Sequence, residues 1–195
     1  VADLILGALA QAVPDRVSAC TNSTCTVALF SGTRQSGPQK GLYWVYLETI
    51  GGGGGARPDA DGLDGIHVHA TNTSNLPVEA LEVEYPLILE RYELVDGSAG
   101  AGRFRGGMGL RRVYRATEEC MVRVDISRNL SRSWGLLGGG PGGHGGFVTS
   151  PGTAPFHRGH GSLRPGESLE VITPGGGGYG PAEEDPSKET ALAAE

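Results

Sequence analysis

Residues 42–55 read LYWVYLETIGGGGG, and this stretch decides the fold class. Its first nine residues are aromatic, aliphatic or β-branched apart from one glutamate, which is the composition of a β-strand. Because apolar side chains stand at nearly every position, we expect this strand to be buried on both faces. The five glycines that follow favour neither helix nor strand, so they indicate a loop over residues 51–62.

Short apolar runs separated by glycine-rich turns continue on both sides of this stretch. The further strands that we predict are residues 24–30, 87–95, 108–116, 120–127, 146–150 and 167–173. The glycine-rich segments between them include residues 96–107, 135–146 and 174–181. Short strands at regular spacing, with glycine between them, indicate a glycine-rich β-sandwich or barrel-like domain.

Helical signals are limited to two places. Apolar residues recur with helical spacing over residues 2–13, and Pro14 closes that pattern. Pro77 suits the first turn of a short helix, which we place over residues 77–84. We therefore predict a mainly β, α+β fold with few short helices.

Composition narrows the class of protein further. A length of 195 residues is typical of one domain, and the net charge of −6 argues against a nucleic-acid-binding protein. No apolar run is long enough to span a membrane and no signal peptide is visible, so we expect a cytoplasmic protein. The three cysteines, Cys20, Cys25 and Cys120, have no zinc or redox spacing and are expected to be reduced thiols. Residues 182–195 carry five acids and one lysine and indicate an acidic tail.

Residues 67–73, HVHATNT, contain the side chains best suited to chemistry. On a strand, His67 and His69 would project from the same face, where two imidazoles can bind a metal or exchange protons near neutral pH. Hydrogen-bonded histidines on a half-buried strand are the alternative. The hydroxyl and amide groups that follow can fix a ligand or build a turn. They belong to Thr71, Asn72 and Thr73.

The glycine runs do not indicate a nucleotide site on this chain. GGGPGG (138–143) fits G-x-G-x-x-G, but it neither opens a long helix nor lies in a βαβ unit. No G-x-x-x-x-G-K-[ST] motif occurs in the sequence, so we predict no P-loop for ATP. TPGGGGYG (173–180) can present backbone N–H groups to an anion, or it can be a plain turn.

Five motifs in order together resemble the hydantoinase B/5-oxoprolinase family, and in particular N-methylhydantoinase B. They are HVHATNT with the following PVEALE and YPL, ERYEL (90–94), GAGRFRGGMGLRR (100–112), WGLLGGGPGGHG (134–145) and TPGGGGYG. The order and spacing match over about residues 42–181 and correspond to the C-terminal part of the family's B-type subunit. We therefore expect residues 1–195 to be a C-terminal portion of a larger subunit, inactive alone.

The resemblance implies an ATP-dependent reaction that opens cyclic amides such as hydantoins, 5-oxoproline and other lactams. It implies an A-type partner subunit that binds ATP and Mg²⁺, in a hetero-oligomer with no nucleic acid and no membrane. It also places the family's metal-site residues in an N-terminal portion outside this chain, so we assign no metal ligand here. The alternatives are a non-catalytic β-rich binding or scaffold module and a subunit of a related ATP-dependent ketone carboxylase.

The resemblance further implies that HVHATNT is a site segment. It predicts catalytic roles for His67, His69 and Asn72. A neutral histidine can move protons during ring opening, and Asn72 can orient a carbonyl. The residues predicted to bind substrate are Thr71, Thr73 and Arg105.

Overall fold

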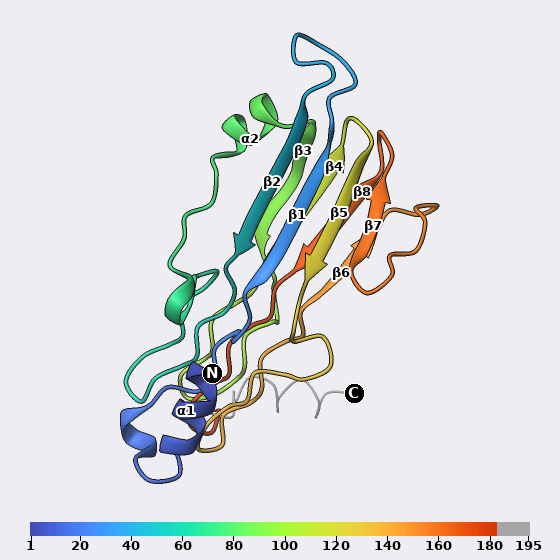
Figure 1. Cartoon of the computed structure of the whole chain (residues 1–195). Helices are drawn as coiled ribbons and strands as arrows, with labels where there is room; N and C mark the ends of the chain where they lie inside the picture. The colour runs from blue at the N-terminus through green and yellow to red at the C-terminus, as the bar shows by residue number, and fades with distance from the viewer. Residues whose placement is uncertain (183–195) are drawn as a thin grey trace, which may run out of the picture.

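The computed structural model describes residues 1–182 and shows two four-stranded antiparallel sheets that lie face to face (Figure 1). The first sheet, in the order β2-β1-β5-β7, consists of Thr26–Thr33 (β1), Tyr43–Ile50 (β2), Cys120–Asp125 (β5) and His160–Leu163 (β7). The second, in the order β3-β4-β8-β6, consists of Leu87–Leu94 (β3), Leu110–Ala116 (β4), Gly146–Thr149 (β6) and Ser168–Ile172 (β8). The described helices are Ala2–Leu9 (α1) and Val78–Glu84 (α2), with 3₁₀ turns at Pro14–Arg16 and His69–Thr71.

The prediction of a mainly β fold is confirmed, and within residues 1–182 the two sheets form an open sandwich, not a closed barrel. Each predicted strand overlaps a strand of the structure, and the helix predicted over residues 77–84 is α2. The sequence did not indicate β7, because its four residues, HGSL, carry a single large apolar side chain. The helix predicted over residues 2–13 ends at Leu9, and Pro14 begins a separate 3₁₀ turn.

β2 is buried on one face only, so the prediction that both faces are buried is wrong. The inner face lies in the core between the sheets through Trp44, Tyr46 and Ile50. On the outer face, the exposed fractions are 70% for Tyr43, 46% for Val45 and 56% for Leu47. The second sheet covers the inner face, and no element of residues 1–182 covers the outer one.

One ion pair joins the two sheets inside the core. Glu48 of β2 and Arg112 of β4 are in contact, and both side chains are buried. The Tyr114 hydroxyl donates to Glu48 Oε2 at 2.7 Å, and the Arg112 guanidinium lies 4.3 Å from the centre of the Tyr92 ring. Because an unpaired buried charge costs several kcal/mol, these contacts favour the arrangement in which β2 faces β4.

Glycine-rich segments pack against one another beyond one end of the sandwich, next to α1 (Figure 1). Residues 51–56 form no helix or strand, as predicted, but they are largely buried. Their backbone is hydrogen-bonded to distant glycine segments: the Gly53 N–H donates to Pro174 O at 2.9 Å, and the Ala56 N–H donates to Gly177 O at 3.0 Å. Backbone groups that are buried in this way must be paired, so the glycine segments form a second, hydrogen-bonded core.

Two further expectations concern cysteine and the ends of the chain. Cys20, Cys25 and Cys120 are free thiols, as predicted. No described helix has both the length and the apolar character needed to cross a membrane. The acidic tail predicted over residues 182–195 lies outside the described residues apart from Ala182.

We predict that Gly55→Ala destabilises the protein by about 3 kcal/mol, the scale of overpacking a close-packed interior. A Cβ atom at Gly55 would lie 1.9 Å from the Ala19 carbonyl oxygen, so two backbone segments must separate. Gly146→Ala is the matched control, because a Cβ atom there meets nothing within 4 Å. Urea unfolding of both variants measures the effect, and equal stabilities would contradict the packing argument.

Candidate functional site

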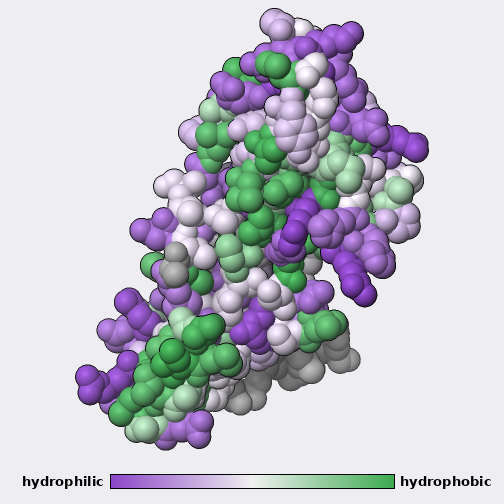
Figure 2. Space-filling model, viewed as in Figure 1, coloured by the Kyte–Doolittle hydropathy of each residue, from purple (hydrophilic) through white to green (hydrophobic). Residues whose placement is uncertain are grey.

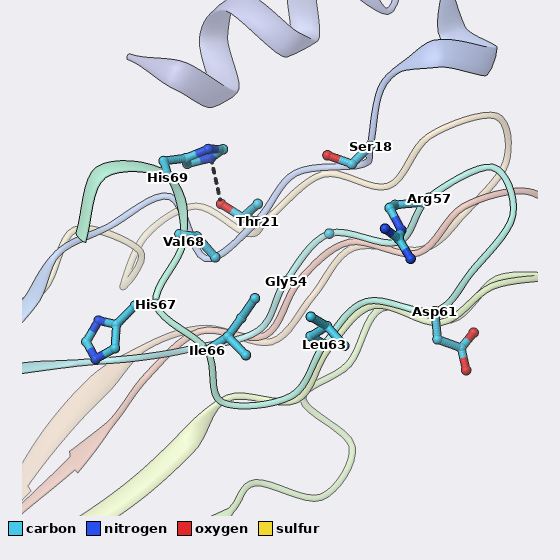
Figure 3. A pocket seen from close by; sticks show the side chains of 11 residues that line it. Ser18, Thr21, Gly54, Arg57, Asp61, Leu63, Ile66, His67, Val68 and His69 are labelled. Carbon is cyan, nitrogen blue, oxygen red and sulfur yellow. Dashed lines mark hydrogen bonds between the residues drawn. The ribbon is translucent and has the colours of Figure 1, made fainter. Parts of the chain in front are cut away.

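The segment HVHATNT is not a strand, so His67 and His69 do not share a face. Ile66 forms only an isolated bridge with Gly52, and His69 then has a left-handed backbone angle, φ 54°. That angle turns the chain into the 3₁₀ turn His69–Thr71. Figure 3 shows the two imidazole rings on different sides of the segment. The prediction that the two histidines project from the same face is therefore wrong.

His69 contacts a buried carboxylate from the first turn of α1. Its Nε2 lies 3.2 Å from Asp3 Oδ2 and 3.3 Å from Thr21 Oγ1. The Asp3 side chain is 6% exposed, whereas that of His69 remains 29% exposed. A histidine with one nitrogen on a buried carboxylate and part of its ring accessible is suited to proton transfer.

Hydrogen bonds keep Asp3 ionised in spite of its burial. Burial alone raises the pKa of Asp3, but hydrogen bonds from Ser23 and Thr21, together with the charge of His69, outweigh it and lower the pKa overall. Thr21 donates to Asp3 twice, from its hydroxyl at 2.7 Å and from its backbone N–H at 3.1 Å. An ionised Asp3 accepts the Nε2 proton of His69, which leaves Nδ1 as the ring's proton acceptor.

Arg128 supports this cluster from the far side of Ser23. Its Nη2 donates to Ser23 Oγ at 2.7 Å and lies 3.3 Å from Cys20 Sγ. Ser23 has φ 55°, so like His69 it is a non-glycine residue in the left-handed region. Such strained residues cluster at functional sites. Burial is the main reason that the pKa of the Cys20 thiol is raised, so it stays protonated and is unsuited to act as a nucleophile.

Two cavities meet at His69. One has a volume of about 250 Å³ and lies between the glycine segment at residues 54–55, Arg57 and Leu63 (Figure 3). The other, of about 260 Å³, lies on the α1 side, next to Asp3 and Ser23. His69 lines both, so its ring borders space in which a small molecule can lie. Within residues 1–182, no three histidine, cysteine or acidic residues lie together as a metal site.

His67 belongs to a different set of contacts. Its Nε2 lies 3.4 Å from Asn75 Oδ1, and Thr73 Oγ1 lies 3.3 Å from its ring. Thr73 Oγ1 is also 2.6 Å from Thr49 Oγ1. His67 and Thr73 therefore lie together and do not contact Asp3, although His67 lines the first cavity together with His69.

Of the remaining predicted site residues, two are hydrogen-bonded within the chain and one is exposed. The Thr71 hydroxyl donates to Val68 O at 2.7 Å, which closes the 3₁₀ turn. Arg105 donates to both carboxylate oxygens of Asp64, at 2.7 and 3.0 Å. Asn72 follows the turn and is exposed. Only His69 of the predicted residues contacts Asp3.

Sequence reasoning missed four members of this cluster: Asp3, Thr21, Ser23 and Arg128. They lie on segments that are distant from HVHATNT in the sequence, and no local motif links them. A model of the family described as hydantoinase B/oxoprolinase matches residues 1–182, so the match includes all four of these residues. The chain belongs to the hydantoinase B/oxoprolinase family. The match thus reaches beyond the motifs at residues 42–181 and includes α1.

The relatives that this chain matches are much longer than the chain itself. An uncharacterized protein of Methanocaldococcus jannaschii is 40% identical over 189 residues, which are 95% of this chain and 32% of that protein. The 5-oxoprolinase 1 of Arabidopsis thaliana is 37% identical over 139 residues, which are 69% of this chain and 11% of that protein. This hydantoinase B/oxoprolinase chain therefore spans about a third or less of the length of these relatives.

The caprolactamase of Pseudomonas jessenii is similar in both sequence and structure. Its subunit beta is 27% identical over 194 residues, which are 92% of this chain and 32% of that subunit. The crystal structure of the ATP-dependent caprolactamase from this organism superposes with a TM-score of 0.70 at 26% identity, over 95% of this chain and 34% of that chain. The sandwich and its glycine-rich end therefore recur in a larger protein of this family.

We predict that Asp3→Asn lowers the free energy of unfolding by about 2 kcal/mol at pH 7, the scale of hydrogen bonds to a charged group. Because the folded pKa of Asp3 lies below its ordinary value, its contribution is present above about pH 4 and is lost as the pH falls through the folded pKa. The difference between wild type and variant should therefore shrink between pH 5 and pH 2.

Urea unfolding at several pH values measures this difference. Asp125→Asn is the matched control, because Asp125 is ion-paired with Arg123 on the surface and should contribute little at any pH. A difference for Asp3→Asn that stays constant down to pH 2 would show that its carboxylate is not held ionised by Thr21 and Ser23.

Proposed function

We propose that this chain forms part of the B-type subunit of an ATP-dependent cyclic-amide hydrolase, in which His69 moves protons during ring opening. The observation that carries the proposal is the contact between His69 and the buried Asp3 at the border of two cavities. Family membership supports the reaction class, because named relatives are a 5-oxoprolinase and a caprolactamase subunit.

The chemistry of ring opening needs a group that both accepts and donates a proton. Water attacks the amide carbonyl and loses a proton, the C–N bond breaks, and the ring nitrogen must gain a proton. With Nε2 held by Asp3, His69 can use Nδ1 for both transfers. Asp3 is then a positioning residue that fixes the tautomer and stabilises the protonated ring.

We assign the other predicted site residues to different roles. Asn72 is exposed next to the turn and remains our candidate for orienting the carbonyl. Thr71 and Arg105 are engaged with Val68 O and Asp64, so we assign them to holding the turn and the adjacent loop. His67 and Thr73 form a second polar cluster, which we assign to the substrate side of the segment.

We propose further that ATP and Mg²⁺ bind to a separate A-type subunit. The chain carries no P-loop motif, and the similar protein from Pseudomonas jessenii is named as subunit beta of a caprolactamase. The solved caprolactamase is described as ATP-dependent. A hetero-oligomer in which this family's B-type chain supplies His69 and the partner supplies ATP hydrolysis accounts for both observations.

We predict that His69→Ala lowers turnover by about two orders of magnitude or more in the complete complex, the usual scale for losing a general acid–base group. Asp3→Asn should lower turnover less, because His69 remains but loses its orienting partner. The matched control is His160→Ala, which removes an exposed histidine of β7. The assay is the turnover of hydantoins and lactams per folded molecule, recorded beside a melting curve.

A scaffold role predicts the opposite result. If His69→Ala melts early but keeps wild-type turnover per folded molecule, His69 is structural and the chain does not supply the acid–base group. If the complete complex turns over no cyclic amide in the panel, the substrate class itself is wrong.

A further inference from the structure

β2 has an unusually open edge. Within residues 1–182 it pairs only with β1, in a continuous register from Thr26↔Ile50 to Thr33↔Tyr43. Its eight residues, YWVYLETI, contain no proline, glycine or lysine, and no bulge interrupts them. Edge strands normally carry such features, which prevent another chain from pairing with them. The inward-pointing charge of β2, Glu48, is paired with Arg112, so the β2 edge can still receive a neighbour.

The hydrogen-bonding groups on this edge can be assigned to particular residues. The Arg34 N–H donates to Leu42 O at 2.9 Å, next to the last pair of the β1–β2 ladder. In an antiparallel ladder alternate residues bond to the partner, so Trp44 and its alternates face β1, whereas Val45 and Leu47 turn their N–H and C=O groups to the free edge.

A groove runs along the same edge. It has a volume of about 500 Å³, with residues 46–49 of β2 on one side and residues 73–77 on the other. The Tyr85 side chain also lines it. The Thr49 and Thr73 hydroxyls lie 2.6 Å apart and join the two sides. In Figure 1 the segment that leads to α2 runs alongside β2, and residues 73–77 of this segment form the second wall of the groove.

The outer face of the sheet is apolar next to this edge. Tyr43, Val45 and Leu47 are exposed there, and Leu29 of β1 lies directly beside Leu47 in the register. Met121 of β5 is also exposed. Figure 2 shows hydrophobic side chains gathered in the middle of the face on which β2, β1 and β5 lie in Figure 1. A further strand paired with β2 would continue this apolar face beyond the present edge of the sheet.

We propose that an extended polypeptide segment adds to β2 as a fifth strand of the first sheet, antiparallel or parallel to it, in this groove. The segment comes from the part of full-length family members that lies outside the region matched by this chain. The argument for this occupant is length: the matched region is 32% of the Methanocaldococcus jannaschii relative and 34% of the caprolactamase chain. About two thirds of each protein must therefore pack somewhere. The free edge of β2 offers the backbone donors and acceptors of Val45 and Leu47, and Leu47 lines the groove itself.

The chemistry of the groove also defines the segment. Because side chains alternate along a strand, the residues that lie beside Val45 and Leu47 on the outer face should be apolar. The residues between them face inward, towards Tyr46 and Tyr85, where the groove is lined by aromatic rings and hydroxyls. The expected segment therefore has apolar residues at alternate positions and no proline in its centre.

Overlapping 12-residue peptides that cover the unmatched two thirds of the Methanocaldococcus jannaschii relative test the proposal with the 195-residue chain. Fluorescence anisotropy should identify at least one peptide that binds at micromolar concentration. Val45→Pro removes an N–H that faces the free edge and leaves the β1 ladder intact, so it should weaken binding at least tenfold. Val45→Thr keeps the N–H and the β-branched shape, so it is the matched control and should bind like wild type.

Hydrogen exchange gives an independent result. The Val45 and Leu47 amides should exchange rapidly in the chain alone and slowly with the bound peptide, while the amides of β5 remain unchanged. A melting curve tests whether Val45→Pro is folded. If it is not, Leu47→Pro, which removes the next edge-facing N–H, takes its place.

Three outcomes would overturn the proposal. The first is that no peptide binds to wild type. The second is that a peptide binds equally well to the folded proline variant. The third is that sedimentation shows a dimer of this chain that Val45→Pro dissociates, because the edge would then receive a second copy. None of these outcomes bears on the His69 assay, so the two proposals fail separately.

Discussion

The close approach of glycine backbones is the constraint on which the rest of the structure depends. At Gly53 an added Cβ would lie 2.1 Å from Gly107 O, and the Gly53 N–H and C=O are bonded to Pro174 and Asn22. The Gly177 N–H donates to Cys20 O in the same region. Residues 20–23 are therefore held on both sides by segments that tolerate no side chain. Because Thr21 and Ser23 lie in this stretch, the glycine packing sets where the Asp3 carboxylate can be bound.

Two of the buried carboxylates, Glu48 and Asp3, are stabilised in different ways. Glu48 is paired with Arg112 between the sheets, where a full opposite charge and the Tyr114 hydroxyl compensate for the loss of water. Asp3 has hydrogen-bond donors from Thr21 and Ser23, with Arg128 one residue further away. The first arrangement neutralises its carboxylate and fixes the two sheets. The second keeps a negative charge available to a histidine that borders open space, as proton transfer requires.

The sequence predicted seven of the eight described strands and proposed His69 as a candidate, but it did not indicate the partners of that histidine. Strands such as residues 42–50 follow from local composition, which is why their number and order are largely correct. Asp3 and His69 are 66 positions apart, so no local pattern links them. A positive φ is uncommon for any residue other than glycine, so the residue type alone does not predict it at His69. Burial of β2 on one face was missed because its apolar residues do not reveal whether a second layer covers them.

The motif WGLLGGGPGGHG explains how a helix with little buried surface places a carboxylate so accurately. α1 exposes Leu4, Ile5 and Leu9, and yet Gly7 lies so close to Trp134 that an added Cβ would be 3.2 Å from the indole. The Trp134 carbonyl accepts the Cys20 N–H at 3.0 Å, so one residue contacts α1 and fixes the stretch that binds Asp3. Ser23 and His69 both have positive φ and both contact Asp3. A left-handed backbone conformation costs about 1–3 kcal/mol at each of these two residues. Their hydrogen bonds to Asp3 offset this cost, and the position of Asp3 depends on the contact between Gly7 and Trp134.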